Sequence, residues 1–296
     1  MSTKSRLNRL YRKTEKICFY EKSRIVLMSD CHRGVGNHGD NFLNNQNLFF
    51  AALCHYNRQK FTYVELGDGD ELWENRKMKT IIQMHSNVFW LLSRFYRDGR
   101  FFMLYGNHDR VKESSRYLKK YCEKYYCEST DCMQELFGAF EAGEGLILEE
   151  KETGNQIFLV HGHQGDFWND TLWRLSRFLV RFVWRRLELF GVQDPTSAAK
   201  NYKRKKRIEK SLSEWAEENN VLLVAGHTHR PVLPIPGESM YVNDGSCVHP
   251  RCITALEIEN GFITLVKWCT MTKADRSLYV GREVLEGPFR LKEYYR

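Results

Sequence analysis

The sequence has no long hydrophobic run. In its 296 residues, no apolar stretch reaches the roughly 18 uncharged residues that a membrane-spanning helix needs. The basic, polar start MSTKSRLNRLYRKTEK also has no apolar segment of the kind found in secretory signals. Internal repeats and low-complexity linkers are missing as well. We therefore expect a globular chain that is neither secreted nor inserted in a membrane.

Cysteines at the usual spacing of metal motifs are also lacking. Nine cysteines are scattered and odd in number, which favours reduced thiols in the cytoplasm over disulfides. Cys122, Cys127 and Cys132 recur every five residues, and Cys247 and Cys252 repeat that gap, whereas zinc and iron–sulfur sites commonly use a two-residue gap. We expect these cysteines to be small buried hydrophobic residues.

Positive charge is present in excess and is concentrated. The net charge is +8, and much of it lies in residues 1–24 and 174–210. Such a concentration favours anionic partners such as phosphates, nucleic acid or acidic lipid, without choosing among them. We interpret residues 1–23 as a basic N-terminal extension.

Five short apolar runs each lead directly into polar residues. They span 24–29, 61–66, 100–105, 156–160 and 221–225. Each is apolar on both faces, which predicts strands of a sheet that is covered on both sides. Helical stretches at 46–58 and 76–97 alternate with them and indicate an α/β fold, in which ligands bind beyond the carboxyl ends of the strands.

The pattern changes towards the end of the chain. Residues 240–243, 252–258 and 262–268 have the composition of strands joined by short turns. Asn260-Gly261 is a typical hairpin turn. We therefore expect a second sheet with antiparallel pairs.

The polar residues after the five runs are of the types that bind metal ions. They are Asp30 and His32, Asp68, Asn107 and His108, His161, and His227 and His229. Carboxylate oxygens and imidazole nitrogens suit divalent ions, and we expect manganese first, with iron and zinc also suited. Two ions roughly 3.5–4 Å apart would clamp a phosphate ester and lower the pKa of a shared water, and the resulting hydroxide would attack phosphorus in line. Asp68 has two oxygens with which to bridge both ions.

The leaving oxygen of such a reaction needs a proton. His108 adjoins Asn107 and is placed to donate it, and Asp109 is placed to orient His108. Arg33 directly follows the first cluster. It can bind a phosphate oxygen or pair with a surface carboxylate, and both interpretations stay open.

The ordered motifs resemble those of the calcineurin-like metallophosphoesterases. That family has D-x-H, GD-x-x-D/E, GNH-D/E, H and GH-x-H, and residues 24–268 contain a counterpart of each. The resemblance implies a four-layer α/β/β/α sandwich of two mixed sheets, forming a single domain over 24–296. It implies one ion held by Asp30, His32, Asp68 and His229, and a second held by Asp68, Asn107, His161 and His227. His163 would lie behind the ligands or contact the substrate.

Residues 167–219 lie between the fourth and fifth motifs and interrupt the series of predicted strands. Their pattern predicts an insertion of two amphipathic helices. Arg174, Arg177, Arg181 and Arg185 would share one face of the first helix. The second helix would carry the basic run from Lys203 to Arg207. The insertion would cap the site, or it would only cover the core with a solvated basic face.

A basic insertion, the GD-x-x-E-L-W form and the GHTHRP sequence with Arg230 resemble one subgroup, the UDP-2,3-diacylglucosamine hydrolases. That resemblance implies a nucleotide-sugar or lipid-linked pyrophosphate as substrate, with Arg230 as a substrate contact. It also implies peripheral contact of residues 171–210 with an anionic membrane at its inner face. GNHD stands where the subgroup has GNRD, which points to a relative with another phosphoester or pyrophosphate substrate.

Other functions stay open beside this one. A protein phosphatase would use the same ester chemistry. A nucleic-acid phosphodiesterase would suit the charge, but the Trp and Phe residues of 167–219 have helical spacing and do not suggest an open stacking groove. A non-catalytic scaffold, like the retromer relative, loses ligands or the third-motif histidine, and this sequence keeps both.

Overall fold

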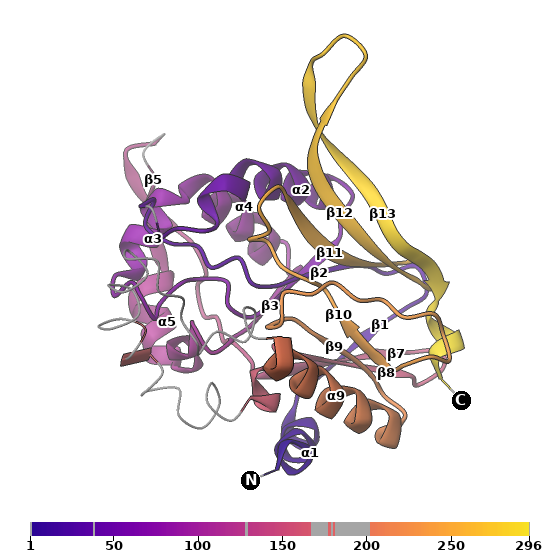
Figure 1. The fold of residues 1–296 in the computed structure, drawn as a ribbon. Helices are drawn as coiled ribbons and strands as arrows, with labels where there is room; N and C mark the ends of the chain where they lie inside the picture. The colour runs from indigo at the N-terminus through magenta and orange to yellow at the C-terminus, as the bar shows by residue number, and fades with distance from the viewer. Residues whose placement is uncertain are drawn as a thin grey trace.

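Two mixed β-sheets lie face to face at the centre of the molecule, with helices on both outer sides (Figure 1). The computed structural model describes residues 2–37, 39–127, 130–166, 177–178, 180 and 202–295. One apolar cluster fills the space between the sheets, and two others lie between a sheet and its helices. The predicted four-layer α/β/β/α sandwich is confirmed.

The larger sheet has six strands in the order β13-β12-β11-β2-β3-β4. Their bounds are Arg24–Met28 (β2), Thr62–Leu66 (β3), Phe101–Leu104 (β4), Cys252–Glu259 (β11), Phe262–Thr272 (β12) and Leu278–Arg290 (β13). Strands β2, β3 and β4 are parallel, whereas β11, β12 and β13 pair antiparallel. The β11–β12 hairpin turns at Asn260 and Gly261, both with positive φ, as predicted. The β12–β13 hairpin projects well beyond the sheet (Figure 1).

The second sheet has five strands in the order β1-β7-β8-β9-β10. Their bounds are Lys16–Phe19 (β1), Gly145–Glu150 (β7), Gln156–Val160 (β8), Leu222–Ala225 (β9) and Tyr241–Asn243 (β10). The pair β7–β8 is antiparallel and the other pairs are parallel. The antiparallel pairs that we expected in a second sheet after residue 240 belong instead to the larger sheet, because β11 pairs with β2.

Successive residues of a strand face opposite sides of the sheet, and both sides of the larger sheet are covered. In β2, Val26 and Met28 face the helices, while Ile25 and Leu27 face the other sheet. A strand covered on both sides needs apolar residues at every position, and this produces the continuous apolar runs of the sequence.

Four helices cover the larger sheet: α2 (Gln46–Arg58), α3 (Met78–Met84), α4 (Ser86–Arg97) and α5 (Ser115–Cys122). The helix predicted over 76–97 is broken at His85. The buried ring of His85 lies 2.8 Å from Gln46 Oε1 and 3.1 Å from Asp40 Oδ2. These contacts hold His85 at φ −110° and ψ 35°, outside the helical region, so the helix restarts after it.

A short hairpin, β5 (Lys124–Cys127) and β6 (Cys132–Glu135), stands apart from the two main sheets. All nine cysteines are free thiols. Cys122 and Cys127 are buried as expected, but Cys132 is exposed at the end of the hairpin.

Helices α1 (Thr3–Lys13) and α9 (Tyr202–Asn219) cover the five-stranded sheet. Leu7 and Leu10 of α1 are buried, and Trp215 of α9 donates a 2.8 Å hydrogen bond to Asn8 Oδ1. Strand β1 pairs with β7. The described part of the expected extension, residues 2–23, thus forms part of the outer helical layer and one edge strand.

The second helix predicted for the insertion is α9. Most of the first, including Arg174, Arg181 and Arg185, lies outside the described residues. In the described part of the chain, every helix is too short or too polar to span a bilayer.

Candidate metal centre

The loops that follow β2, β3, β4, β8 and β9 meet at one edge of the two sheets. Five predicted ligands in these loops have a left-handed backbone: Asp30 (φ 51°), His32 (47°), Asp68 (50°), His227 (66°) and His229 (54°). This conformation costs a non-glycine residue on the order of 1–3 kcal/mol and concentrates at functional sites. It turns the chain sharply, so residues two apart can face the same point.

The first group consists of Asp30, His32 and His229, whose ligand atoms all lie within 4.8 Å of one another. Asp30 Oδ1 is 3.0 Å from His229 Nε2 and 3.6 Å from His32 Nε2. Asp68 Oδ2 lies 3.9 Å from His32 Nε2. The structure thus brings together the four residues predicted for the first ion.

The second group consists of Asp68, His161 and His227. Asp68 Oδ2 is 3.1 Å from His161 Nε2, and the rings of His161 and His227 are 5.1 Å apart. Asn107 is buried, and among the described residues its amide atoms have no hydrogen-bond partner. Asp68 thus belongs next to both groups, as its predicted bridging role requires.

Hydrogen bonds behind the ligands determine which atoms face the centre. His161 Nδ1 lies 2.9 Å from the carbonyl oxygen of Leu66, so this nitrogen carries a proton and Nε2 is the nitrogen that faces the centre. His32 Nδ1 lies 2.9 Å from Glu71 Oε2 in the same way. Both Nε2 atoms and Asp30 Oδ1 are buried and make no hydrogen bond in the described part of the chain, and their close polar contacts are with other predicted ligands. Such a set of nitrogen and oxygen atoms fits divalent metal ions.

The charges of the site reinforce one another. Burial opposes ionisation of Asp68, but His161 and His108 outweigh it and hold the pKa of Asp68 well below its usual value. Burial alone would lower the pKa of His161, yet Asp68 and Asp30 raise it to about 9. The carboxylates are therefore ionised and ready to bind cations.

His108 is held by Glu71 and Trp73. Its Nδ1 is 2.7 Å from Glu71 Oε2, and its ring stacks on Trp73 with centroids 4.2 Å apart. The His108 side chain is 23% exposed, whereas the ligands His161 and His227 are buried, so its other nitrogen can reach a bound substrate. Burial lowers the pKa of His108, but the charges of Glu71 and Asp68 outweigh it and raise that pKa.

The prediction that Asp109 orients His108 is wrong. Asp109 accepts hydrogen bonds from the backbone N–H groups of Gly106 and Gly69 and from Lys112 Nζ. Its two oxygens are thus occupied in bracing the second and third motif loops. Glu71, three residues after Asp68, takes the role we gave to Asp109.

The structure also places Arg33 away from any substrate. Its guanidinium is fully buried, with Nη1 and Nη2 at 2.8 and 2.9 Å from Glu65 and Nε at 2.7 Å from Asp70. The phosphate contact is therefore ruled out, and the carboxylates that pair with Arg33 belong to the core rather than the surface. Lys112 joins this network at 2.6 Å from Asp70.

His163 and Arg230, the other predicted contacts, lie beside the centre. The buried ring of His163 is 5.6 Å from that of His161, and its nitrogens lack hydrogen-bond partners among the described residues. Arg230 is exposed and lies 3.1 Å from Glu209 of α9. Their contact with a substrate stays a prediction.

Sequence reasoning missed three supporting residues. Glu71 was recognised only as part of the second motif. Trp73 follows it by two positions, and its stacking on His108 leaves no periodic signal. Asp166 lies 3.4 Å from His227 Nε2 and belongs to a loop that no motif covers.

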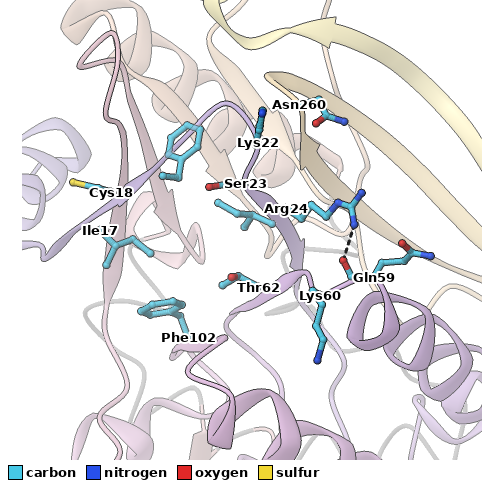
Figure 2. Close-up of a pocket in the computed structure, with 12 residues that line it drawn as sticks. Ile17, Cys18, Lys22, Ser23, Arg24, Gln59, Lys60, Thr62, Phe102 and Asn260 are labelled. Atoms are coloured by element: carbon cyan, nitrogen blue, oxygen red, sulfur yellow. Dashed lines mark hydrogen bonds between the residues drawn. The ribbon is translucent and has the colours of Figure 1, made fainter.

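A separate cavity of about 670 Å³ lies at the opposite end of the strands, where β2 and β3 begin. Figure 2 shows Lys22 and Lys60 pointing in opposite directions and Arg24 turned towards Gln59. Arg24 also pairs with Glu259 at 2.6 Å. The basic side chains around this cavity do not converge on a common point, so we assign no binding site to it.

The comparison with protein families agrees with the motifs. A family model described as calcineurin-like phosphoesterase matches residues 23–231. A search of curated proteins finds no significant match. Among solved structures, the chain is similar to a predicted phosphoesterase from Streptococcus pneumoniae, with 15% identity, 88% of this chain and 97% of the other covered, and a TM-score of 0.35. It is also similar to Chaetomium thermophilum Vps29, with 12% identity, 88% and 96% covered, and a TM-score of 0.40.

Proposed function

The chain belongs to the calcineurin-like phosphoesterase family, and on this basis we propose that it is a metal-dependent hydrolase of phosphoester or pyrophosphate bonds. One observation carries the proposal. Residues from five separate motifs converge at one sheet edge, and several of their buried ligand atoms lack partners among the described residues. Buried polar atoms of a stable fold are normally hydrogen-bonded, so this set fits a bound cation.

Two divalent ions would be held by residues of this chain. Asp30, His32, Asp68 and His229 would hold the first, and Asp68, Asn107, His161 and His227 the second. When bound, such ions activate the attacking water and neutralise charge on the phosphate. Manganese is our first choice, with iron or zinc also compatible with the donor atoms.

His108 would act as the general acid. Glu71 binds its Nδ1, so Nε2 would be the nitrogen that protonates the leaving oxygen. Stacking on Trp73 restricts the ring to one plane. A scaffold protein has no need of this arrangement, so it favours an enzyme.

The substrate would be anionic. Lys203, Lys206 and Arg207 are exposed in the first half of α9, and Arg204 of the same helix reaches Asp166 beside His227. Positive charge this close to a phosphate site raises the local concentration of anions. We propose a nucleotide-sugar or lipid-linked pyrophosphate, with residues 171–210 contacting an anionic membrane at its inner face.

A substrate panel with Mn²⁺ tests this function. It compares an aryl phosphate, a bis-aryl diester, a UDP-sugar and an acylated UDP-sugar. We expect Mn²⁺-dependent hydrolysis with preference for the acylated compound, and loss of that preference when residues 172–200 are deleted while α9 is kept. A protein that binds two ions yet hydrolyses none of these phosphates would contradict the proposed function. Preference for the simple diester would instead favour a nucleic-acid phosphodiesterase.

A further inference from the structure

Two sets of side-chain contacts connect helix α9 to the last motif loop. The helix precedes β9, and the loop after β9 carries His227 and His229. One contact runs through Asp166 to His227, and the other runs through Glu209 to Thr228 and Arg230. Asp166, His227 and Thr228 are buried, whereas Arg230 is exposed.

The first contact is a chain of three side chains. Arg204 Nε lies 3.0 Å from Asp166 Oδ1, and a second guanidinium nitrogen binds the same oxygen. The other oxygen, Asp166 Oδ2, lies 3.4 Å from His227 Nε2. Asp166 is 3% exposed and Arg204 is 16% exposed, so water screens this chain poorly.

The second contact holds the same loop at two other residues, Thr228 and Arg230. Thr228 Oγ1 donates to Glu209 Oε1 at 3.1 Å, and Arg230 Nη1 donates to Glu209 Oε2 at 3.1 Å. Glu209 is five residues after Arg204 on the helix. The helix therefore fixes both the ring of His227 and the backbone that leads to His229.

We propose that Arg204 and Asp166 are positioning residues that hold His227 in the orientation needed to bind the second ion. The proposal rests on the proposed function, since it assumes that His227 is a ligand. Asp166 binds Nε2 of His227, which leaves Nδ1 as the nitrogen that faces the ion. Arg204 holds Asp166 in place, so helix α9 tunes the affinity of the second site.

This assignment gives Arg204 a different role from its basic neighbours. Lys203, Lys206 and Arg207 are exposed, whereas Arg204 is largely buried and pairs with Asp166. The second site therefore depends on a residue that lies between the fourth and fifth motifs. A ligand or deletion that shifts the start of α9 would weaken the second ion without touching a ligand residue.

Calorimetric titration of the full chain with Mn²⁺ tests the proposal. Carboxylates that orient a ligand histidine typically change metal affinity by about 10- to 100-fold. We expect Arg204→Ala to weaken the second ion by about this factor, and Arg204→Lys to restore part of the affinity. Arg207→Ala is the matched control, because it removes the same charge from an exposed position of the same helix, and it should leave both affinities unchanged.

A second pair of variants separates positioning from general destabilisation. Asn107→Ala removes a ligand of the second site only, so one ion remains. Adding Arg204→Ala to Asn107→Ala should not change the affinity of that remaining ion. If it does, or if Arg204→Ala weakens both ions equally, the positioning role is wrong. Asp166→Asn, which keeps the shape of the side chain, replaces Arg204→Ala if the latter does not fold.

The failures of the two proposals can be told apart. If the unaltered protein binds two ions and Arg204→Ala and Asp166→Asn both bind them equally well, the role of α9 is overturned while the proposed function stands. If the unaltered protein binds fewer than two ions at millimolar Mn²⁺, both proposals fail.

Discussion

At the residue scale, each of three predicted ligand histidines is held by one ring nitrogen, and this would leave the other nitrogen for a metal ion. His161 uses Leu66 O, His32 uses Glu71 and His227 uses Asp166. Such partners fix both the tautomer and the orientation of the ring. Glu71 also binds His108, so one carboxylate supports a ligand and the candidate acid together.

Replacing His108 by alanine separates proton donation from metal binding. We expect kcat for an aryl phosphodiester to fall by about 10²- to 10⁴-fold, because the leaving oxygen loses its proton donor. Bound metal, measured by elemental analysis, should stay near the unaltered level since His108 is not a ligand. Equal turnover in the variant would remove His108 from the mechanism.

Replacing Arg33 tests its reassignment from substrate contact to core residue. Arg33→Met leaves Glu65 and Asp70 buried without their main cation, and this should lower the free energy of unfolding by about 3–5 kcal/mol. Urea denaturation measures the change. Arg230→Met, at an exposed arginine, should stay within about 0.5 kcal/mol of the unaltered protein. A small effect at Arg33 would contradict the buried network.

At the element scale, the N-terminal helix is a structural layer rather than an appendage. Leu7 of α1 is fully buried and belongs to the same apolar cluster as Trp215 of α9 and Phe158 of β8. Helix α1 therefore supports α9, and α9 in turn holds the last motif loop.

Truncating Leu7 measures how much this layer contributes. Leu7→Ala should destabilise the protein by about 2–5 kcal/mol, because it removes buried methyl groups and leaves a cavity. Arg9→Ala changes an exposed position of the same helix and should have little effect. Thermal and urea unfolding report both changes. An unaffected Leu7 variant would mean that the helix contributes little to the fold.

At the scale of the whole molecule, the two sheets bring distant segments together at one edge. Strands β2, β3 and β4 come from one sheet, and β8 and β9 come from the other. Neither sheet alone supplies a complete ligand set, since Asp30 and Asp68 follow the first and His161 and His227 follow the second. Bound ions would therefore link the two sheets.

Removing the metal should loosen this link. We expect a chelator to abolish hydrolysis and lower the melting temperature, and Mn²⁺ at 100 times its Kd to restore about 2.7 kcal/mol per site. Differential scanning calorimetry checks the shift. Asp68→Ala, which removes the predicted bridging carboxylate, should bind less metal and respond less to the chelator. Two ions at full occupancy in Asp68→Ala would contradict the bridging role.

The amino-acid sequence was enough to predict the five strands that lead into the motifs and the ligand types at their ends, and the resemblance of its motifs to a known family implied the four-layer fold. Apolar runs and short motifs are local signals, and strands that run parallel must bring their carboxyl ends to one edge. Even helix α2 begins and ends at the predicted residues, 46 and 58.

The side chains that support the predicted ligands depend on tertiary packing, which the sequence did not reveal. Arg33 pairs with Glu65, and Asp166 contacts His227. His108 is held by Glu71 and not by Asp109. The break at His85 likewise depends on Asp40 and Gln46. The residues that pair are far apart in sequence, whereas Asp109 adjoins His108 but forms its hydrogen bonds elsewhere. Local sequence patterns predict neither result, because the packing of the sheets and helices determines which side chains meet.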